Sequence, residues 1–359
     1  MPTSINGRPI AFMFALACIA AGLIGCNNAA APAAAKQRQQ RTPAMQVGLV
    51  WDDRFLLHVA DKPDHPESPA RLTAIRRGLE DAGLWPQLVP IPVRPAAEAD
   101  ILRVHSRDHL RRVLACATAD GVTWFDPDTY AVPASVDAAL LAAGGVCAAV
   151  DAVMAGQVRT AFCAVRPPGH HATHDRAMGF CLLNNVAIAA RYAQAAHKVG
   201  RILIVDWDVH HGNGTQDAFW RDGEVMYVSL HQSPLYPHTG AADEKGEGRG
   251  YGHIRNYPLR PKSGRAEFFA ALDGALAAAE AFCPRLIFIS CGFDAHEADP
   301  LADLRLTTED YAEATRRVRR LADRTAGGRV ISVLEGGYDL EAIGRAAAAH
   351  VAALGAIGV

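Results

Sequence analysis

An apolar segment of the chain ends in acidic and imidazole side chains at alternate positions, a spacing that can bind a metal ion. Residues 202–205 read Ile-Leu-Ile-Val, and Asp206, Asp208 and His210 follow. Side chains alternate between the two faces of a β-strand, so these three groups are expected on one side. A carboxylate and an imidazole two residues apart can share one ion, and a third ligand from elsewhere would leave an open position for water. The pattern therefore predicts a catalytic metal site rather than a polar strand end whose acids only cap neighbouring loops.

Other polar clusters also come directly after segments that have the apolar character of buried strands. They are Pro167–His171, Cys291–Asp294 and Glu335–Tyr338. Ligands of open α/β sheets bind outside the carboxyl ends of the strands. We therefore expect these clusters to meet the Asp208 and His210 pair at one edge of a sheet.

The segments that must position these clusters alternate between apolar strands and Ala-rich helices. The predicted strands are Gln46–Trp51, Thr160–Val165, Arg201–Asp206, Val225–Leu230, Arg285–Ser290 and Arg329–Leu334. The predicted helices are Pro69–Ala82, Ser135–Ala155, Asn185–His197, Arg265–Phe282 and Thr308–Ala326. This alternation predicts a single α/β domain, an open parallel sheet with helices on both faces.

Length and composition agree with one large enzyme-sized domain. The chain has 359 residues, half of them hydrophobic, and a formal net charge of −2. This length allows a large core. The balanced charge gives no reason to expect nucleic acid as a partner.

Residues 1–26 have the pattern of a secretory signal peptide. Arg8 and the free amine precede the uncharged stretch 10–25, which is too short to span a bilayer comfortably. Its ending, Leu23-Ile-Gly-Cys26, resembles a bacterial lipoprotein signal in which Cys26 becomes the lipidated first residue. An uncleaved anchor or an ordinary signal is the alternative. Residues 27–44 are predicted to form a flexible tether and 45–359 the catalytic domain, exported to the bacterial cell envelope and lipid-anchored on its periplasmic side.

From about Gly48 to its end, the chain resembles the histone deacetylase family, including its bacterial histone deacetylase-like and acetylpolyamine amidohydrolases. The motifs that carry this resemblance are His65-Pro-Glu67 with Arg71-Leu72, Val104-His-Ser106, Arg166-Pro-Pro-Gly-His170-His171, Gly179-Phe180-Cys181, Asp206–Gly214, Ser229-Leu230-His231, Gly292-Phe-Asp294-Ala-His296 and Gly336-Gly-Tyr338. Each motif is weak alone, but the ordered set is specific. The resemblance implies an arginase-like open sheet, in agreement with the pattern of strands and helices.

The resemblance also implies roles for individual residues at the metal. It assigns Asp208, His210 and Asp294 as the ligands of one zinc ion per chain. Beside the reacting water it places a pair of histidines, His170 and His171. It further implies that Asp206 orients the first of these histidines and that Tyr338 donates a hydrogen bond to the oxyanion.

The substrate would enter through a narrow tunnel. The resemblance implies that Phe180, next to Gly179, and Tyr236 line this tunnel and accept the acylated side chain. Asp128 is the candidate for an acid at the rim that holds the substrate backbone. The alignment is loose there, and Asp126 is the competing candidate.

Two further features are implied by the resemblance alone. The first is a structural potassium site, formed by backbone oxygens around Asp206, Asp208 and His210 together with Ser229 and Leu230. The second is a position for Arg71 near the path by which acetate leaves.

The two histidines are expected to differ in charge. His170, next to the acid Asp206, is expected to be cationic, because such a partner fixes both tautomer and charge. Asn213 stands where some branches of the family place an acid behind the second histidine. An amide can orient His171 without raising its pKa, so His171 is expected to be neutral and to act as the general base.

Tyr338 follows two glycines, which predicts a hydroxyl on a mobile turn that can swing toward the oxyanion. Some deacetylase branches carry histidine at this place and are feeble catalysts. The tyrosine of this chain therefore favours true activity.

Together these features predict a zinc-dependent amidohydrolase that removes acetyl or short acyl groups from lysine-like or polyamine amines. A ureohydrolase with two manganese ions is one alternative, but it needs more bridging acids than this ligand set supplies. A catalytically weak acyl-amine-binding lipoprotein is the other, and its mark would be a lost ligand or a lost Tyr338. An exported protein does not meet chromatin, so acetylated polyamines or acylated peptides are the expected substrates. The sequence does not predict the oligomeric state.

Overall fold

The computed structural model describes residues 47–59, 62 and 64–355. The predicted signal peptide (1–26), the predicted tether (27–44) and the lipidation site Cys26 lie outside the described residues. The signal, the tether and the lipid anchor therefore stay predictions.

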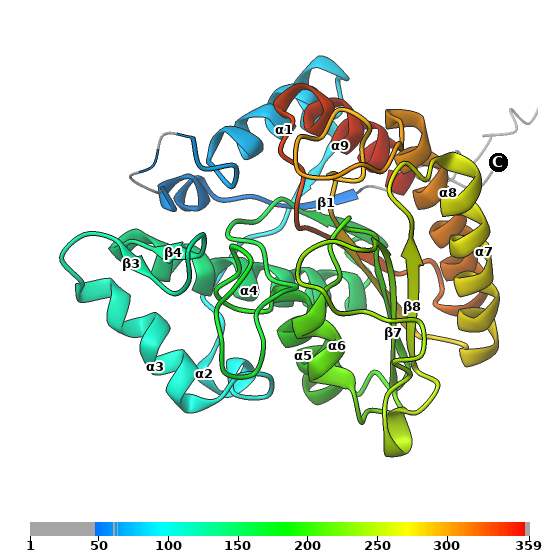
Figure 1. The fold of residues 1–359 in the computed structure, drawn as a ribbon, viewed down its shortest axis with the longest axis horizontal. Coiled ribbons are helices and arrows are strands. Elements are labelled where there is room, and N and C mark those ends of the chain that lie inside the picture. The colour runs from blue at the N-terminus through cyan, green and yellow to red at the C-terminus, as the bar shows by residue number, and fades with distance from the viewer. Residues whose placement is uncertain (1–46, 60–61, 63, 356–359) are drawn as a thin grey trace, which may run out of the picture. The chain divides into compact units, whose positions relative to one another are not determined.

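A parallel sheet of eight strands forms the centre of the described domain (Figure 1). Its strands, in spatial order, are β2 (Val89–Pro90), β1 (Val47–Val50), β5 (Thr160–Cys163), β10 (Val330–Leu334), β9 (Leu286–Cys291), β6 (Ile202–Asp206), β7 (Val225–Gln232) and β8 (Ile254–Leu259). Every neighbouring pair is parallel. The five central strands from β5 to β7 are buried along their whole length, which explains why they read as continuous apolar runs.

Helices cover both faces of this sheet, which confirms the predicted fold class (Figure 1). One face is covered by α1 (Ala70–Asp81), α7 (Arg265–Phe282), α8 (Thr308–Thr325) and α9 (Leu340–Gly355). The other is covered by α4 (Pro133–Met154), α5 (Asn185–His197) and α6 (Asn213–Phe219). The remaining elements are α2 (Glu98–Ile101), α3 (Arg107–Ala115), the antiparallel pair β3 (Thr123–Trp124) and β4 (Tyr130–Ala131), and the short 3-10 helices η1 (Asp53–Leu57), η2 (Trp85–Gln87), η3 (Cys116–Thr118) and η4 (Gly248–Gly250).

The six predicted strands and five predicted helices are present, with ends that differ by a few residues. The sequence analysis missed the edge strand β8, in which buried and partly exposed residues alternate and the exposed Pro258 interrupts the pattern. A proline is tolerated there because an edge strand has an unpaired side. It also missed α3, which lies outside the two helical layers, and α6 and α9, which complete those layers.

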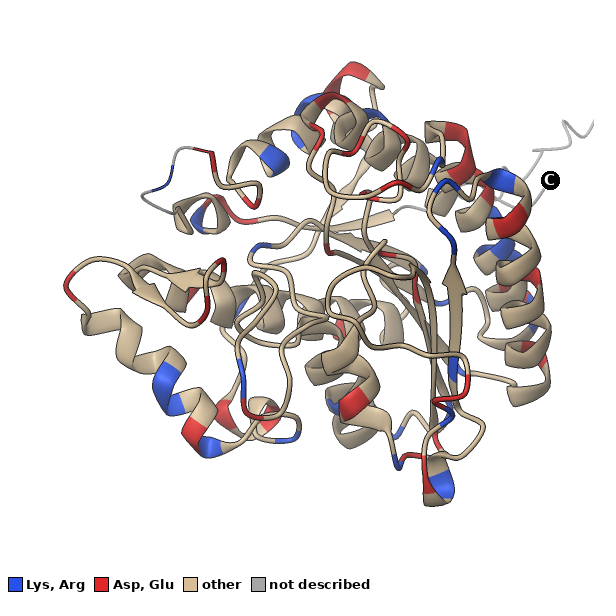
Figure 2. Cartoon of the chain, viewed as in Figure 1, with Lys and Arg blue, Asp and Glu red and all other residues tan. Residues whose placement is uncertain are grey.

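Charged residues of both signs occur together along the outer helices (Figure 2). On α8, Glu313 accepts hydrogen bonds from Arg316 (3.0 Å), Arg317 (2.9 Å) and Arg320 (3.3 Å). The run of arginines on this helix is thus partly neutralised by an acid of the same helix.

The longest helix, α4, is apolar enough to cross a membrane by length and composition, with a mean hydropathy of 1.8. Within the domain, however, 83% of that apolar window is buried, as in a core helix. The segment that carries Arg94 and Ala96 crosses α4 closely, and the Ala96 N–H donates to the Leu140 carbonyl of this helix (2.8 Å). A Cβ at Gly144 would lie 1.8 Å from the Arg94 carbonyl oxygen, so only glycine permits this crossing.

Replacing Gly144 by alanine is predicted to lower the free energy of unfolding by about 2 kcal/mol or more, because the methyl group would overlap backbone atoms. Gly274 in α7 is the matched control, since a Cβ there would lie 3.9 Å from Tyr257 Cε1. Gly274→Ala should raise the free energy of unfolding by roughly 0.5–1 kcal/mol, because alanine is the better helix former. Urea denaturation followed by circular dichroism measures both values, and equal effects would contradict the close crossing.

Candidate active site

The polar clusters predicted from the sequence meet at one edge of the sheet because of the strand order. They follow β5, β10, β9 and β6, which are far apart in the chain but consecutive in the sheet. The strands are parallel, so their carboxyl ends lie together. The loops that follow them, together with Asp206 at the end of β6, supply every residue predicted at the metal.

Asp208, His210 and Asp294 form a cluster whose ligand atoms all lie within 4.8 Å of one another. His210 Nδ1 lies 3.1 Å from Asp208 Oδ1 and 3.3 Å from Asp294 Oδ2. Both carboxylates are buried, and within the described residues Asp294 Oδ2 accepts no hydrogen bond. Two carboxylates and one imidazole around a shared space, with one buried oxygen left without a donor, are what a divalent cation requires. The residues present therefore fit a metal ion.

Backbone groups and two glycines hold these ligands in place. The Val209 N–H donates to Asp294 Oδ1 (2.9 Å), and the Gly336 N–H donates to Asp208 Oδ2 (2.7 Å). A Cβ at Gly292 would lie 2.2 Å from Asp208 Oδ2, and one at Gly336 would lie 2.0 Å from Asp294 Oδ2. The glycines let the ends of β9 and β10 approach the carboxylates closely.

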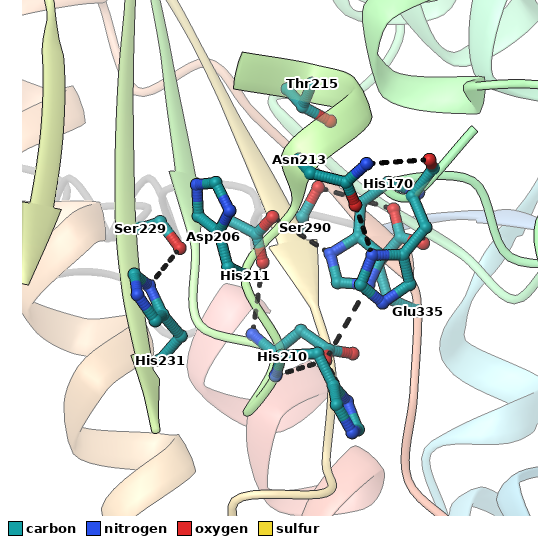
Figure 3. Close-up of polar contacts among 12 residues, drawn as sticks. His170, Asp206, His210, His211, Asn213, Thr215, Ser229, His231, Ser290 and Glu335 are labelled. Atoms are coloured by element: carbon teal, nitrogen blue, oxygen red, sulfur yellow. Dashed lines mark hydrogen bonds and ion pairs between the residues drawn. The ribbon is translucent and has the colours of Figure 1, made fainter. Parts of the chain in front are cut away.

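His170 and Asp206 lie beside the cluster (Figure 3). His170 Nδ1 is 3.1 Å from Asp206 Oδ2, and the Tyr227 hydroxyl donates to the same oxygen (2.9 Å). Burial alone would lower the pKa of His170, but the carboxylates of Asp208 and Asp206 raise it to about 10. The structure thus pairs this imidazole with the acid that the sequence predicted, and the pair favours the cationic form.

His171 is the neighbouring ring, 4.0 Å from that of His170 between centroids. Its Nδ1 lies 2.8 Å from Asn213 Oδ1, and Asn213 Nδ2 lies 3.4 Å from the His171 carbonyl oxygen. Burial, followed by the charges of His170 and His210, holds the pKa of His171 well below its usual value. Two adjacent imidazoles are therefore pushed toward opposite charge states, an arrangement typical of an acid and base pair.

A pocket of about 690 Å³ opens over this cluster. The predicted metal ligand His210, both histidines of the pair and Tyr338 line it. The residues predicted for the substrate tunnel line it as well: Gly179, Phe180, Tyr236 and Asp128. The rings of His171 and Tyr236 meet edge to face at 5.1 Å, and those of Phe180 and Tyr338 at 5.9 Å.

The two candidate rim acids differ in position. Asp128 lines the pocket, whereas Asp126 Oδ1 accepts the N–H of Asp128 (3.1 Å) and stabilises the turn. Burial and the nearby Asp126 raise the pKa of Asp128 to about 6. The geometry favours Asp128 as the acid that a substrate would meet.

Tyr338 lies on a turn whose backbone is held at four points. The bonds run from the Gly336 N–H to Asp208 Oδ2 (2.7 Å), from the Phe293 N–H to the Gly336 carbonyl (3.0 Å), from Arg71 Nε to the Gly337 carbonyl (2.7 Å) and from the Tyr338 N–H to Asp299 Oδ2 (2.7 Å). The sequence predicted a mobile turn from its two glycines. In the structure Gly336 serves close approach and Gly337 has a φ of 116°, so movement of the phenol is left to side-chain rotation.

Three residues of this site were not given their positions by the sequence analysis. Glu335 Oε2 accepts the N–H groups of Gly169 (2.7 Å) and His170 (3.1 Å), so a buried carboxylate holds the histidine loop. Asp299 Oδ2 accepts the Tyr338 N–H (2.7 Å) in the same way, whereas the Tyr227 hydroxyl donates to Asp206 (2.9 Å). The sequence shows that Glu335 is an acid directly after a strand, but it does not show which loop this acid binds.

The residues of the predicted potassium site lie on the neighbouring strands β6 and β7 and in the loop directly after β6. Asp206 is opposite Ser229 in the register of β6 and β7, and Ser229 Oγ lies 2.9 Å from His231 Nδ1 (Figure 3). Arg71 is fully buried and bonds Glu67 (3.1 Å) as well as the turn of Tyr338. The potassium ion and the acetate path stay predictions.

Residues 65–354 match the family profile of the histone deacetylase domain. The chain belongs to the histone deacetylase family. It is 42% identical over 277 residues to the histone deacetylase-like amidohydrolase of Pseudomonas aeruginosa, covering 76% of this chain and 72% of that protein. It is 38% identical over 301 residues to a probable deacetylase of Archaeoglobus fulgidus, covering 83% and 82%. The crystal structure of the HDA15 HD domain superposes with a TM-score of 0.82 at 40% identity, covering 87% of this chain and 88% of that one.

A divalent cation is predicted to raise the Tm of the metal-free protein, because an ion that binds only the folded state stabilises that state. At an ion concentration of 100 times the Kd, this stabilisation is about 2.7 kcal/mol. Asp294→Ala should remove this increase, since it deletes one ligand. Asp303→Ala is the control: it removes an exposed carboxylate from the loop that follows Asp294, and this variant should keep the increase in Tm. Thermal unfolding over a zinc titration measures the shift, and a full increase in Asp294→Ala would place the ion elsewhere.

Proposed function

We propose that this deacetylase-family hydrolase is a zinc-dependent amidohydrolase that removes acetyl or short acyl groups from lysine-like or polyamine amines. The observation that carries the proposal is a single pocket in which His210 of the Asp208, His210 and Asp294 cluster meets two histidines of opposite charge preference and a tyrosine. Amide hydrolysis needs an activated water, a stabilised oxyanion and a proton for the departing amine. The pocket supplies a group for each.

A zinc ion held by the three ligands would polarise the acyl oxygen and make the attacking water more acidic. His171 then acts as the general base. Its Nδ1–H is bound to the Asn213 oxygen, so its Nε2 is free to take the proton of the water and pass it to the amine. His170, cationic beside Asp206, stabilises negative charge that develops at the acyl group. The Tyr338 hydroxyl donates to the oxyanion.

The observations favour this proposal over the two alternatives. Within the described residues, one group of three or more possible ligand residues could hold an ion, whereas a ureohydrolase needs further acids to bridge a second metal. An acyl-amine-binding protein without activity would have no need to retain Tyr338 beside His210 in the pocket, with Asp208 and Asp294 completing the ligand cluster.

The substrate class is proposed from the predicted export of the chain. A protein tethered to the bacterial envelope through a lipid on Cys26 would meet acetylated polyamines and acylated peptides rather than chromatin. Supporting this, the pocket offers an apolar wall of aromatic rings for an acyl chain and the acid Asp128 at its lining. Measured hydrolysis rates on a panel of acetylpolyamines and acyl-lysine peptides would rank these two classes as substrates.

Tyr338→Phe is predicted to lower kcat on an acetyl-lysine reporter by about 10²–10³, because it removes one donor to the oxyanion. Zinc content should stay at one ion per chain. Tyr251 is 67% exposed, and Tyr251→Phe is the matched control that should keep full activity. Zinc-loaded wild-type protein that binds acetylated amines without releasing acetate would contradict the proposed activity.

Asn213→Asp is predicted to move the acidic limb of the pH–rate profile to higher pH. The rate rises with pH as His171 loses its proton, and a carboxylate in place of the amide raises the pKa of His171. The basic limb should not change. Profiles of kcat/KM against pH for the two proteins measure this, and superimposable acidic limbs would show that His171 is not the titrating base.

A further inference from the structure

Asp299 is a buried carboxylate beside the active site that the mechanism above does not use. It is 7% exposed. Its two oxygens accept two backbone N–H groups: Oδ2 accepts from Tyr338 (2.7 Å) and Oδ1 from Leu301 (3.0 Å). Both of these residues line the substrate pocket. One side chain therefore ties the turn that carries the phenol to the loop that contributes Leu301 to the pocket wall.

The loop that carries Asp299 is itself held firmly. The Asp299 N–H donates to the His296 carbonyl (2.9 Å), and the Glu297 N–H donates to the Leu306 carbonyl (2.8 Å). The Leu306 N–H in turn donates to the Ala295 carbonyl (3.0 Å). Asp299 thus offers its oxygens from a fixed base, which a positioning group requires.

No ion pair accounts for this buried acid. Among the residues that the structure describes, no lysine, arginine or histidine lies within ion-pair distance of Asp299. A buried carboxylate is costly unless hydrogen bonds satisfy it, and backbone N–H groups, those of Tyr338 and Leu301 among them, satisfy this one. Its contacts point to the turn of Tyr338 rather than to a charged partner.

The bond from Tyr338 is half of a two-sided contact with a single peptide group. The Gly337 carbonyl and the Tyr338 N–H belong to the same planar peptide unit. Arg71 Nε donates to that carbonyl (2.7 Å) while Asp299 accepts from that N–H (2.7 Å). Because Gly337 is a glycine with a φ of 116°, this peptide plane could otherwise rotate easily. Its orientation sets the direction in which the Cα–Cβ bond of Tyr338 leaves the backbone.

We propose that Asp299 is a positioning residue that, together with Arg71, fixes the Gly337–Tyr338 peptide plane and so places the Tyr338 hydroxyl over the metal cluster. The inference rests on the proposed role of Tyr338 as the oxyanion donor. It assigns a function in catalysis to a residue that touches neither the metal ligands nor the substrate.

The test is a double-mutant cycle between Asp299→Asn and Tyr338→Phe. Asparagine has the same shape but one acceptor oxygen, and its NH₂ group would face the second backbone N–H. Asp299→Asn should lower kcat on an acetyl-lysine reporter by about 10–100-fold, the range expected for a small misplacement of a catalytic group, with little change in KM. In the Tyr338→Phe background it should change kcat by less than about twofold, because the hydroxyl that it places is gone.

An equal fall in both backgrounds would overturn the proposal, since it would show that Asp299 acts on general structure. Asp303→Asn, an exposed acid four residues further along the same loop, should change kcat in neither background. Zinc content should be unchanged in Asp299→Asn, which separates this role from an effect on Asp294. If Asp299→Asn does not fold, Asp299→Glu, which keeps both acceptors but shifts them by one methylene, replaces it with the same expected pattern.

Hydrogen exchange followed by mass spectrometry supplies a readout that does not depend on activity. Peptides that contain Tyr338 should exchange faster in Asp299→Asn than in wild type, whereas peptides from β9 should not. Unchanged exchange at Tyr338 would overturn the proposal. Faster exchange in a protein whose zinc-loaded wild type has no deacetylase activity would leave the contact standing and would instead refute the proposed function.

Discussion

Two buried carboxylates facing one imidazole are the constraint on which the rest of this structure depends. Asp208 and Asp294 both approach His210 Nδ1 within 3.3 Å, and neither has access to solvent. Burial and the charge of Asp208 raise the pKa of Asp294 to about 7. Burial also acts to raise the pKa of Asp208, but the nearby His170 and His210 outweigh it, so the pKa of Asp208 is lowered. Like charges in a dry site are costly unless a cation lies between them. The arrangement makes physical sense as a metal centre.

The sheet order is what brings this constraint about. β5, β10, β9 and β6 are neighbours in space, and the loop after each contributes a different part of the site. The close approach of these loops excludes Cβ atoms at Gly292 and Gly336, next to the carboxylates. It also lets long-range hydrogen bonds hold the loops to one another, as when Glu335 binds the loop of His170. Ligand placement, base orientation and the tyrosine turn are therefore parts of one connected set of contacts.

The sequence could predict the fold and the members of the site because their signals are local. Apolar runs separated by helical patterns indicate a parallel sheet, and Asp208 and His210 occur on one short segment directly after a strand. The contacts that hold the site could not be predicted in this way. The bonds of Asp299 to Tyr338 and of Arg71 to Gly337 join segments 39 and 266 residues apart, and no local pattern records such partners. The edge strand β8 was missed for a different reason, since its half-exposed face and Pro258 remove the apolar signal.

Anomalous diffraction at the zinc absorption edge, from crystals of the metal-loaded protein, tests the central claim most directly. The account predicts one strong peak per chain, about 2.0–2.2 Å from His210 Nδ1 and from one oxygen each of Asp208 and Asp294. A peak at any other place, or ligand atoms too far apart to share one ion, would contradict it.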